Sequence, residues 1–433
     1  MAKPLRIGIC GTGIFAQWFI PVFKAHPSVA EVVLCDHDPG RLAAAARRHG
    51  IERTVADLDE LLVSDVDAVA IFTPRDLHAP VAARALRAGK HVYCAVPAAQ
   101  TLAELEELLQ LVRETGLTYM IGETSYYYPV ALYCRERFRA GHFGAFVYGE
   151  GEYLHDMAHG FYHAFRLNGG VNWKARAGFP PMLYPTHSTS MLVSVFGQRL
   201  SSVSSLGYVD RHDDGIFREE ANPWKNRFSN ESALFRTSGG GMFRVNEFRR
   251  VGHGTGNCVR ASFFGTHGCF EQQCDSHAWT DLAKGLWNVN DLLECAVKPE
   301  GNVEEGVQED FKTGLARIHP VERLPEELLP QPNGHSGSHY FLVDDFIRSI
   351  RTGKLPPNHI WNAIRYTAPG IVAHESSRKE GERLDVPDFG DPPPEASFLD
   401  DELPIVSPEA KAHIEATAPD LSELETGEEA LPG

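Results

Sequence analysis

His187 is the residue whose type and position point most directly to proton transfer. It stands in the stretch MLYPTHSTSM, residues 182–191, just before an apolar run that ends at Gly197. This run predicts a helix over 188–196. A histidine beside the N-terminus of a helix is held neutral near pH 7 by the helix dipole, which lets it accept a proton. Tyr184, three residues earlier, is either a proton donor or a packing residue, and a histidine in such a place can also be purely structural.

Further polar and aromatic residues extend the set that could do chemistry. Glu123 ends the segment TYMIGE, just after the last predicted parallel strand, and should lie at the carboxyl edge of a sheet, where open α/β sheets bind ligands. Side chains that could contact a substrate, or simply pack between domains, are Tyr126, Tyr128, His155, Trp173 and Lys174. Histidines at 155, 159 and 163 are close in sequence, but no acidic or cysteine set accompanies them, so we predict no metal site.

A glycine-rich turn, GTGIFA at 11–16, joins an apolar strand to a helix. In such a turn the glycines let the backbone approach a pyrophosphate, and the helix N-terminus offers it unpaired N–H groups. Asp36 ends the second strand, where a carboxylate binds the ribose hydroxyls and repels a 2′-phosphate. The sequence therefore predicts NAD in preference to NADP, although the turn alone can be structural. The candidate cofactor contacts in this region are Gly11, Thr12, Gly13, Ile14, Phe15, Asp36 and Arg41.

The elements that must position these residues fall into three parts. Over 1–125, apolar strands alternate with helices, which indicates α/β class and a Rossmann domain with a doubly wound parallel sheet. Over 126–375, short alternating segments such as GMFRVNEFRR predict a substrate-binding α+β domain with a largely antiparallel open sheet, in which 208–230 and 277–338 are long loops. Residues 376–433 form an acidic, partly extended tail that we expect to be solvated or loosely draped.

Composition excludes several classes of protein. The chain has 433 residues and 43% hydrophobic content, enough for two cores. No apolar run is long enough to span a membrane, and no basic stripe with aromatics suggests nucleic-acid binding. The eight scattered cysteines and an N-terminus that passes directly into a strand favour a cytoplasmic protein with reduced thiols. We expect the open sheet to be covered in a homodimer or homotetramer.

The stretch IFTPRDLHAPVAARALRAGKHVYCAVPAAQT resembles the nucleotide domain of the Gfo/Idh/MocA oxidoreductases. Thr73, Pro74 and His78 match that family's TP-x-x-x-H element, and 89–92 match its GKHV element. The resemblance implies cofactor contacts from these residues and from the later turn that contains Val96 and Pro97. That turn departs from the family, because Ala-Val-Pro replaces Glu-Lys-Pro. The family lysine assists hydride transfer, and since valine cannot donate a hydrogen bond, the proton chemistry must rest elsewhere.

The segment around His187 is similar to one branch of that family, the NAD-dependent α-N-acetylgalactosaminidases and related redox glycosidases. Tyr-Pro-Thr-His at 184–187, Val-Pro-Ala-Ala at 96–99, Glu123 and the strand EYLHDM all agree with that branch, as does NGHSGSHYFLVDDF. Ser188 differs, since the branch often has glycine after the histidine.

Three functions remain open at this point. The first, which we favour, is an NAD-dependent oxidoreductase acting on a sugar, sugar derivative or glycoside, in which His187 takes a hydroxyl proton as the hydride leaves. The second is a redox-neutral glycosidase: C3 is oxidised, a base such as Tyr184 or Glu123 removes the C2 proton, the anomeric substituent is eliminated, water adds, and the hydride returns. The third is a non-catalytic nucleotide-binding regulator.

Overall fold

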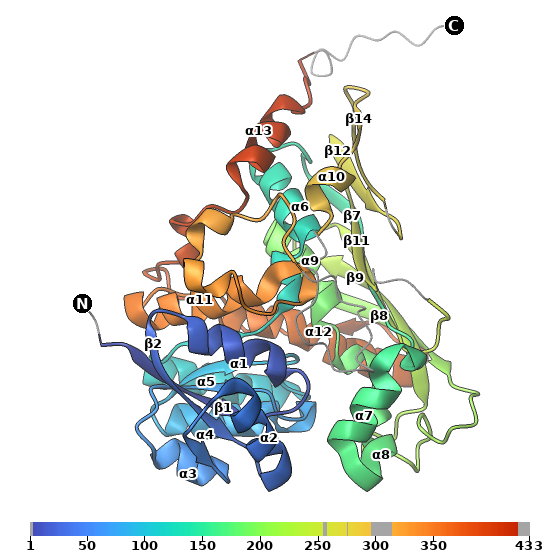
Figure 1. Ribbon diagram of the computed structural model, residues 1–433. Coiled ribbons are helices and arrows are strands. Elements are labelled where there is room, and N and C mark those ends of the chain that lie inside the picture. The colour runs from blue at the N-terminus through green and yellow to red at the C-terminus, as the bar shows by residue number, and fades with distance from the viewer. Residues whose placement is uncertain (1–2, 254–257, 275, 296–313, 423–433) are drawn as a thin grey trace, which may run out of the picture.

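The first 121 residues build a parallel sheet with helices on both faces (Figure 1). The computed structural model describes residues 3–253, 258–274, 276–295 and 314–422. The strand order is β3-β2-β1-β4-β5-β6. This order is that of a doubly wound Rossmann sheet, as the sequence predicted. The strands are β1 (Leu5–Cys10), β2 (Val29–Cys35), β3 (Thr54–Val55), β4 (Ala68–Ile71), β5 (His91–Cys94) and β6 (Tyr119–Ile121).

The helices of this part begin where the sequence supplies caps. They are α1 (Ala16–Ala25), α2 (Pro39–His49), α3 (Leu58–Val63), α4 (His78–Arg87) and α5 (Leu102–Thr115). The Asp38 carboxylate accepts from the first N–H groups of α2, and Thr101 with Glu104 forms a capping box at α5. Such side chains satisfy backbone donors that a helix leaves unpaired. They fix each helix start relative to the preceding strand, and so fix the edge at which ligands bind.

A second sheet has nine strands in the order β14-β13-β12-β11-β7-β10-β9-β8-β15. Only β7 and β10 pair in parallel, and the remaining neighbours are antiparallel, which confirms a largely antiparallel sheet. The strands are β7 (Phe146–Leu154), β8 (Leu200–Val209), β9 (Phe228–Thr237), β10 (Met242–Phe248), β11 (Val259–Gly265), β12 (Gly268–Gln272), β13 (His277–Asp281), β14 (Leu286–Asn288) and β15 (Leu384–Asp385).

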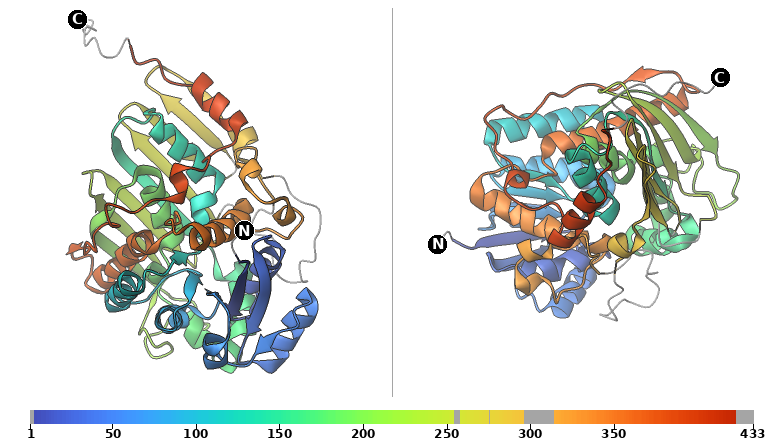
Figure 2. Two further views of the ribbon diagram at one scale, coloured as in Figure 1. Left: turned by 90° about the vertical axis from the view of Figure 1, so that its left-hand side faces the viewer. Right: turned by 90° about the horizontal axis from the view of Figure 1, so that it is seen from above.

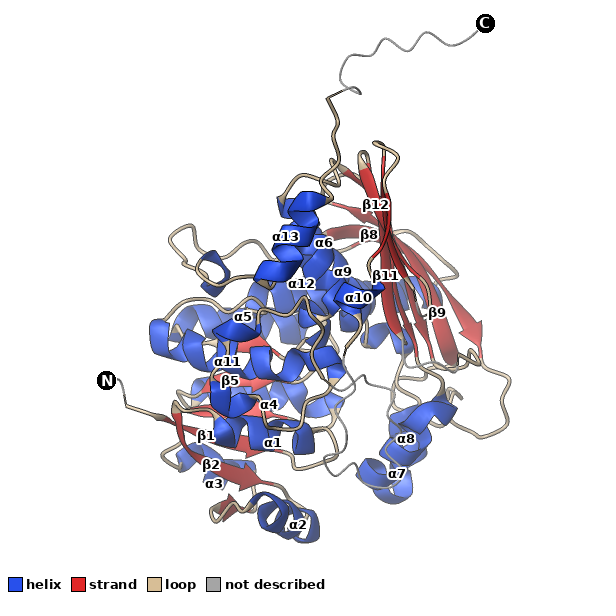
Figure 3. Ribbon diagram, turned by 45° about the horizontal axis from the view of Figure 1, so that its top comes forward, coloured by secondary structure: helices blue, strands red, loops and turns tan. Residues whose placement is uncertain are grey.

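One face of this second sheet is covered by helices that also reach the first sheet (Figures 2 and 3). Helix α9 packs on β7 and α12 on β8, while α12 also contacts β6 and α5. Helix α11 crosses back to pack on α1. The helices are α6 (Pro129–Arg139), α9 (Thr186–Phe196), α11 (Ser338–Thr352) and α12 (Ile360–Arg378). This shared layer brings the α9 N-terminus to the edge of the Rossmann sheet.

Two expectations about the later chain need correction. Residues 277–288, predicted as loop, form β13 and β14, followed by α10 (Asn290–Leu293), because alternating side chains such as Trp279 face the core. Residues 296–313 of that predicted loop lie outside the described residues. The acidic segment after α12 is not loosely draped as far as residue 417. Its helix α13 (Pro408–Ala416) buries Ile414, and Arg137 donates to the carbonyl of Thr417 at 2.8 Å.

Within the described ranges, no helix has the length and apolar character that crossing a membrane requires. A projecting segment, residues 157–177, carries α7 (Tyr162–Gly169) and α8 (Trp173–Ala177) away from the second sheet and alongside the Rossmann part (Figure 1).

Candidate active site

His187 lies in the first turn of α9 and forms a buried pair with Glu123. The Nδ1 atom of His187 is 2.7 Å from Oε1 of Glu123, and the two side chains are 4% and 0% exposed. Burial would raise the pKa of Glu123, but the charge and hydrogen bond of His187 and the N–H of Ser125 outweigh it, so the pKa of this carboxyl is lowered. Glu123 is therefore an anion that accepts a hydrogen bond from the imidazole ring.

This geometry sets the roles of the two residues. Because Nδ1–H donates to Glu123, Nε2 is the ring nitrogen left to exchange a proton. Glu123 was predicted as a possible base that removes a substrate proton. Its Oε1 accepts from His187 and from the Ser125 N–H, at 2.7 and 2.8 Å, which suits positioning of His187, while its Oε2 is buried and has no hydrogen-bond partner among the described residues.

Two tyrosines and a second histidine surround the imidazole of His187. Ring centroids of Tyr153 and Tyr184 lie 5.2 and 5.3 Å from it, and that of His335 lies 6.4 Å away. Burial raises the pKa of both phenols, against the opposing charge of Arg75 and Arg249. Both tyrosines are thus neutral O–H groups at pH 7.

Tyr153 was not among the site residues that the sequence predicted. The signal was available, because residues 153 and 155 alternate with 154 along β7 and so share one face of the strand. The Tyr153 hydroxyl lies 2.8 Å from Nδ1 of His155, and the other nitrogen of His155 faces the carbonyl of His159. Burial lowers the pKa of His155 to about 4. His155 is therefore neutral and sits behind Tyr153, so the structure gives it a supporting position for that phenol.

Ser188, the residue that differs from the glycine expected after the histidine, joins a buried ionic network. Its hydroxyl donates to Glu247 at 2.6 Å, and Glu247 pairs with Arg249 at 3.0 Å. Burial raises the pKa of Glu247 to about 7, although Arg249 acts in the opposite direction. The guanidinium of Arg249 lies 4.6 Å from the centroid of the Tyr153 ring. The residue after His187 thus links α9 to strand β10 and to the cation beside Tyr153.

Arg75 faces the same region from the Rossmann part. It stands in the turn Arg75–Leu77, directly after Thr73 and Pro74, and its guanidinium carbon lies 4.3 Å from the centroid of the Tyr184 ring. A small hollow between the two parts, with about 250 Å³ of empty space including its open side, is lined by Arg75, Phe161, Phe165, Phe179, Tyr184 and Arg249. The hollow thus has two cations on aromatic walls.

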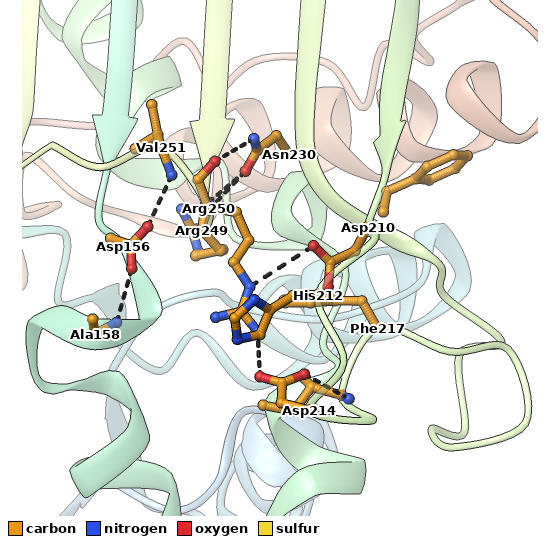
Figure 4. Close-up of polar contacts among 12 residues, drawn as sticks. Asp156, Ala158, Asp210, His212, Asp214, Phe217, Asn230, Arg249, Arg250 and Val251 are labelled. Carbon is orange, nitrogen blue, oxygen red and sulfur yellow. Dashed lines mark hydrogen bonds and ion pairs between the residues drawn. The ribbon is translucent and has the colours of Figure 1, made fainter.

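The wall that carries Phe161 is tied to the ends of the second sheet (Figure 4). The Asp156 carboxylate accepts from the N–H groups of Ala158 and Val251, each at 2.9 Å. Arg250 pairs with Asp214, and its Nε lies 3.8 Å from Asp210. These contacts fix the start of the projecting segment 157–177 relative to β10. They hold its aromatic side chains opposite Arg75.

The predicted dinucleotide loop requires a glycine at its first position. Gly11 has φ of +91°, and a Cβ there would lie 2.7 Å from the carbonyl oxygen of Phe72, so only glycine fits. Asp36 accepts from the N–H and the hydroxyl of Thr12, both at 2.9 Å, and Arg41 lies 3.8 Å from its carboxylate. Gly13 and Ile14 lead into α1.

The loop after β4 contains further residues predicted to contact the cofactor. The Thr73 hydroxyl is buried and has no protein partner among the described residues, as expected for an atom that meets a ligand. His78 differs from its prediction as a cofactor contact, because its two ring nitrogens face the carbonyls of Pro97 and Thr73 at 2.8 and 2.9 Å. His78 therefore fastens the loop of Thr73 and Pro74 to the turn of Val96 and Pro97, and it acts on a cofactor only through them.

The loop before α11 covers this dinucleotide site. The rings of Phe15 and His335 meet edge to face with centroids 5.5 Å apart, and Nδ1 of His335 lies 3.0 Å from Nε2 of His339. The His339 ring in turn lies 4.2 Å from that of Phe19 in α1. Residues 333–339, which the sequence set apart only by resemblance, thus connect the glycine-rich turn with His187.

Three predicted substrate contacts lie elsewhere. Tyr126 donates to Asp400 and stacks on Arg135, so it holds the C-terminal segment. Lys174 donates to the carbonyl of Asp214 at 2.8 Å from an exposed position on α8, and the neighbouring Trp173 packs on Tyr162. Neither can replace the missing lysine beside His187. Tyr128 lies nearer to the pair of His187 and Glu123, because it is buried and the charge of Glu123 helps to raise the pKa of its phenol.

No group of three or more His, Cys, Asp or Glu side chains arranged to hold a metal occurs within the part of the chain that the structure describes.

Comparison with known proteins supports the expected family. Residues 5–123 match the Gfo/Idh/MocA profile, an oxidoreductase family with an NAD-binding Rossmann fold. A Glycosyl hydrolase family 109 protein of Saccharopolyspora erythraea is 27% identical over 413 residues, which is 89% of this chain and 83% of that protein. Another such protein, from Streptomyces niveus, is 27% identical over 408 residues, or 89% of this chain and 77% of that one.

Among solved structures, a levoglucosan dehydrogenase in complex with NADH and L-sorbose aligns with a TM-score of 0.69 and 20% identity, covering 90% of this chain and all of that one. This likeness is one of fold.

Proposed function

We propose that this chain, which belongs through residues 5–123 to the Gfo/Idh/MocA oxidoreductases, oxidises a hydroxyl-bearing carbon of a carbohydrate with NAD as the hydride acceptor and His187 as the base. The observation that carries the proposal is the buried pair of His187 and Glu123 at 2.7 Å, placed where the dinucleotide sheet meets the second sheet. The resemblance to carbohydrate enzymes over nearly the whole chain supports the substrate class.

The residues of this chain would act in sequence. His187 takes the substrate hydroxyl proton at Nε2, and Glu123 stabilises the imidazolium that results. The neutral phenol of Tyr184 donates a hydrogen bond to a neighbouring substrate oxygen. The phenol of Tyr153 already donates to Nδ1 of His155 at 2.8 Å, so towards the substrate it can only accept, and both rings help to exclude water. NAD, when bound, supplies the acceptor for the hydride that leaves the carbinol carbon.

The residues present fit NAD. The left-handed Gly11, the unpaired Thr73 hydroxyl and the buried Asp36 would hold the pyrophosphate and the ribose. Asp36 opposes a 2′-phosphate, so we propose NAD as the preferred form, although Arg41 lies beside it.

A second function is favoured by the two Glycosyl hydrolase family 109 proteins. In it, oxidation at C3 acidifies the C2 hydrogen, a base removes that proton, the anomeric substituent leaves, water adds and the hydride is returned. Tyr153 and Tyr184 both lie beside His187 and offer phenol oxygens for this proton transfer. No pair of carboxylates of the usual glycosidase kind is required.

One experiment tests both functions. The purified protein is incubated in heavy water with free sugars and aryl glycosides, while NADH is followed by fluorescence and the sugar by proton NMR. NADH in proportion to substrate, without cleavage, supports the dehydrogenase. Release of the aglycone with substoichiometric NAD and deuterium at C2 supports the glycosidase. If His187→Ala still transfers hydride at the wild-type rate, the base assignment is wrong.

We also propose a homo-oligomer, a dimer or tetramer, in which the uncovered face of the nine-stranded sheet meets a second copy. Large apolar side chains are exposed on its strands, including Leu206 and Leu234 at 62% and 49%. Light scattering on wild type and Leu234→Asp checks this, and a wild-type monomer would contradict it. A cytoplasmic location stays a prediction from the sequence.

A further inference from the structure

Arg75 places a positive charge beside Tyr184, a residue next to His187. The turn that carries a lysine in most of the resembled family carries Val96 here, as in the resembled glycosidase branch, and Val96 is buried and apolar. Arg75, from the neighbouring β4 loop, places a cation at 4.3 Å from the Tyr184 ring, and Tyr184 lies 5.3 Å from His187 between ring centroids. The guanidinium and the imidazole therefore both lie beside the ring of Tyr184.

The charge of Arg75 is not balanced by a neighbouring carboxylate. No ion pair of its guanidinium occurs within the described ranges, although most other arginines near the site have one. Its surroundings are aromatic: the guanidinium carbon lies 5.5 Å from the ring centroids of both Phe165 and Phe179. One hydrogen bond of the half-buried Arg75 goes to the Tyr184 hydroxyl, and a guanidinium has five N–H donors, so donors remain for a carboxylate or phosphate.

Arg249 adds a second positive charge to the same hollow. Arg249 contacts Glu247 at 3.0 Å, whereas Arg75 has no ion-pair partner among the described residues, so Arg75 is the cation of the hollow that lacks a carboxyl neighbour. Opposite charges in such a partly enclosed place attract more strongly than in water, because the local dielectric constant is lower. A neutral sugar would leave this charge unpaired.

We propose that Arg75 binds an anionic substituent of the substrate, so that the preferred carbohydrate is an acidic one, with a carboxylate as in a uronic acid or uronide. This inference rests on the proposed function, since it places a sugar next to His187. It assigns Arg75 to substrate selection, and it leaves proton transfer to His187.

The test compares sugars that differ only in this group. Thermal unfolding with NAD present is measured for the His187→Ala variant with D-glucuronate against D-glucose and D-galacturonate against D-galactose. This variant removes turnover, so binding is read without chemistry. We expect the acid of at least one pair to stabilise the protein at tenfold lower concentration than its neutral partner. If no acid stabilises the protein more than its neutral partner, the inference is wrong, whatever the base does.

Variants of Arg75 locate the effect. In the otherwise wild-type chain, Arg75→Gln should lower kcat/KM for the acid at least tenfold, mainly through KM, and should change the neutral sugar by less than threefold. Arg75→Lys should retain part of the preference. The matched control is Arg166→Gln, because Arg166 also stacks on aromatic rings of the projecting segment, at 5.0 Å from Trp173, but does not line the hollow.

The outcomes separate the two claims. Loss of hydride transfer in His187→Ala with the acid preference intact supports both. An acid preference with unchanged hydride transfer in His187→Ala refutes the base assignment alone. If Arg75→Gln weakens NAD binding and leaves the acid preference unchanged, Arg75 serves the cofactor, and the inference fails.

Discussion

Replacing Glu123 by Gln should slow hydride transfer about a hundredfold without unfolding the protein. Oε1 of Glu123 accepts from His187 and from the N–H of Ser125, at 2.7 and 2.8 Å, and the amide oxygen of Gln can accept both bonds. The substitution therefore removes the charge and keeps the shape. A hydrogen bond to a charged partner contributes about 1.5–3 kcal/mol, compared with about 0.5–1.5 for a neutral one.

The size of the effect follows from that difference. About 1–2 kcal/mol corresponds to roughly 5–30-fold in rate, and the lost attraction for the imidazolium formed in the reaction adds to it. General acid–base catalysis as a whole contributes about 10²–10⁴-fold, which sets the upper limit. The assay is stopped-flow appearance of NADH in a single turnover, beside a fluorescence titration that should give the same NAD affinity within twofold.

Ser125→Ala is the matched control, because its hydroxyl lies 3.4 Å from the same Nδ1 atom and carries no charge. We expect less than a threefold change in rate for it. Proton–nitrogen NMR of histidine-labelled protein provides a reading without substrate: the His187 signals, identified by their loss in His187→Ala, should show the proton on Nδ1 in wild type. The reasoning is refuted if Glu123→Gln keeps a third or more of the wild-type rate, or if His187 carries its proton on Nε2.

Three further changes test the cofactor site and the packing. Asp36→Ala should lower the affinity for NAD at least tenfold and that for NADP less, by fluorescence titration; a larger loss for NADP would contradict the assigned specificity. Gly11→Ala should abolish NAD binding and cost about 1–3 kcal/mol in urea unfolding, because φ is +91°. Burial lowers the pKa of His319 to about 4, so its contribution to stability, about 3 kcal/mol, is present above pH 6.5 and lost as pH falls toward 4. His319→Gln should therefore make the free energy of unfolding in urea less dependent on pH over this range. An unchanged pH dependence would exclude this histidine as its source.

The Rossmann part could be predicted in detail because its signals are local. A strand, a glycine turn, a helix and a carboxylate at a fixed distance are all determined within 32 residues, from Leu5 to Asp36, and a structure that uses them needs no distant partner. The acidic C-terminal segment could not be predicted in this way. Its charge density indicates a solvated chain, yet Arg137 and Tyr126, nearly 300 residues earlier, bind Thr417 and Asp400.

The site could be predicted in part for a related reason. His187 and Glu123 were candidates because each ends or begins an element at a ligand-binding edge, but their pairing depends on how the sheets meet. Tyr153 and Arg75 gave weaker signals, since a tyrosine in a strand and an arginine in a turn are usually packing or surface residues. Only the placement of both beside Tyr184 gives them a chemical meaning.

The departures from the family pattern are coupled to residues that the pattern does not contain. Where the resembled family as a whole carries a lysine, this chain has an apolar Val96, as the resembled glycosidase branch does, and a cation from the neighbouring loop, Arg75, stands beside Tyr184. Where the branch has glycine after the histidine, Ser188 donates to a buried Glu247. A degenerate site would be expected to lose polar groups without replacement, because a buried ionic group without partners is costly. Only the lysine is a lost group here, since Ser188 adds a hydroxyl, and that hydroxyl has a buried partner in Glu247, which supports our proposal of a working site.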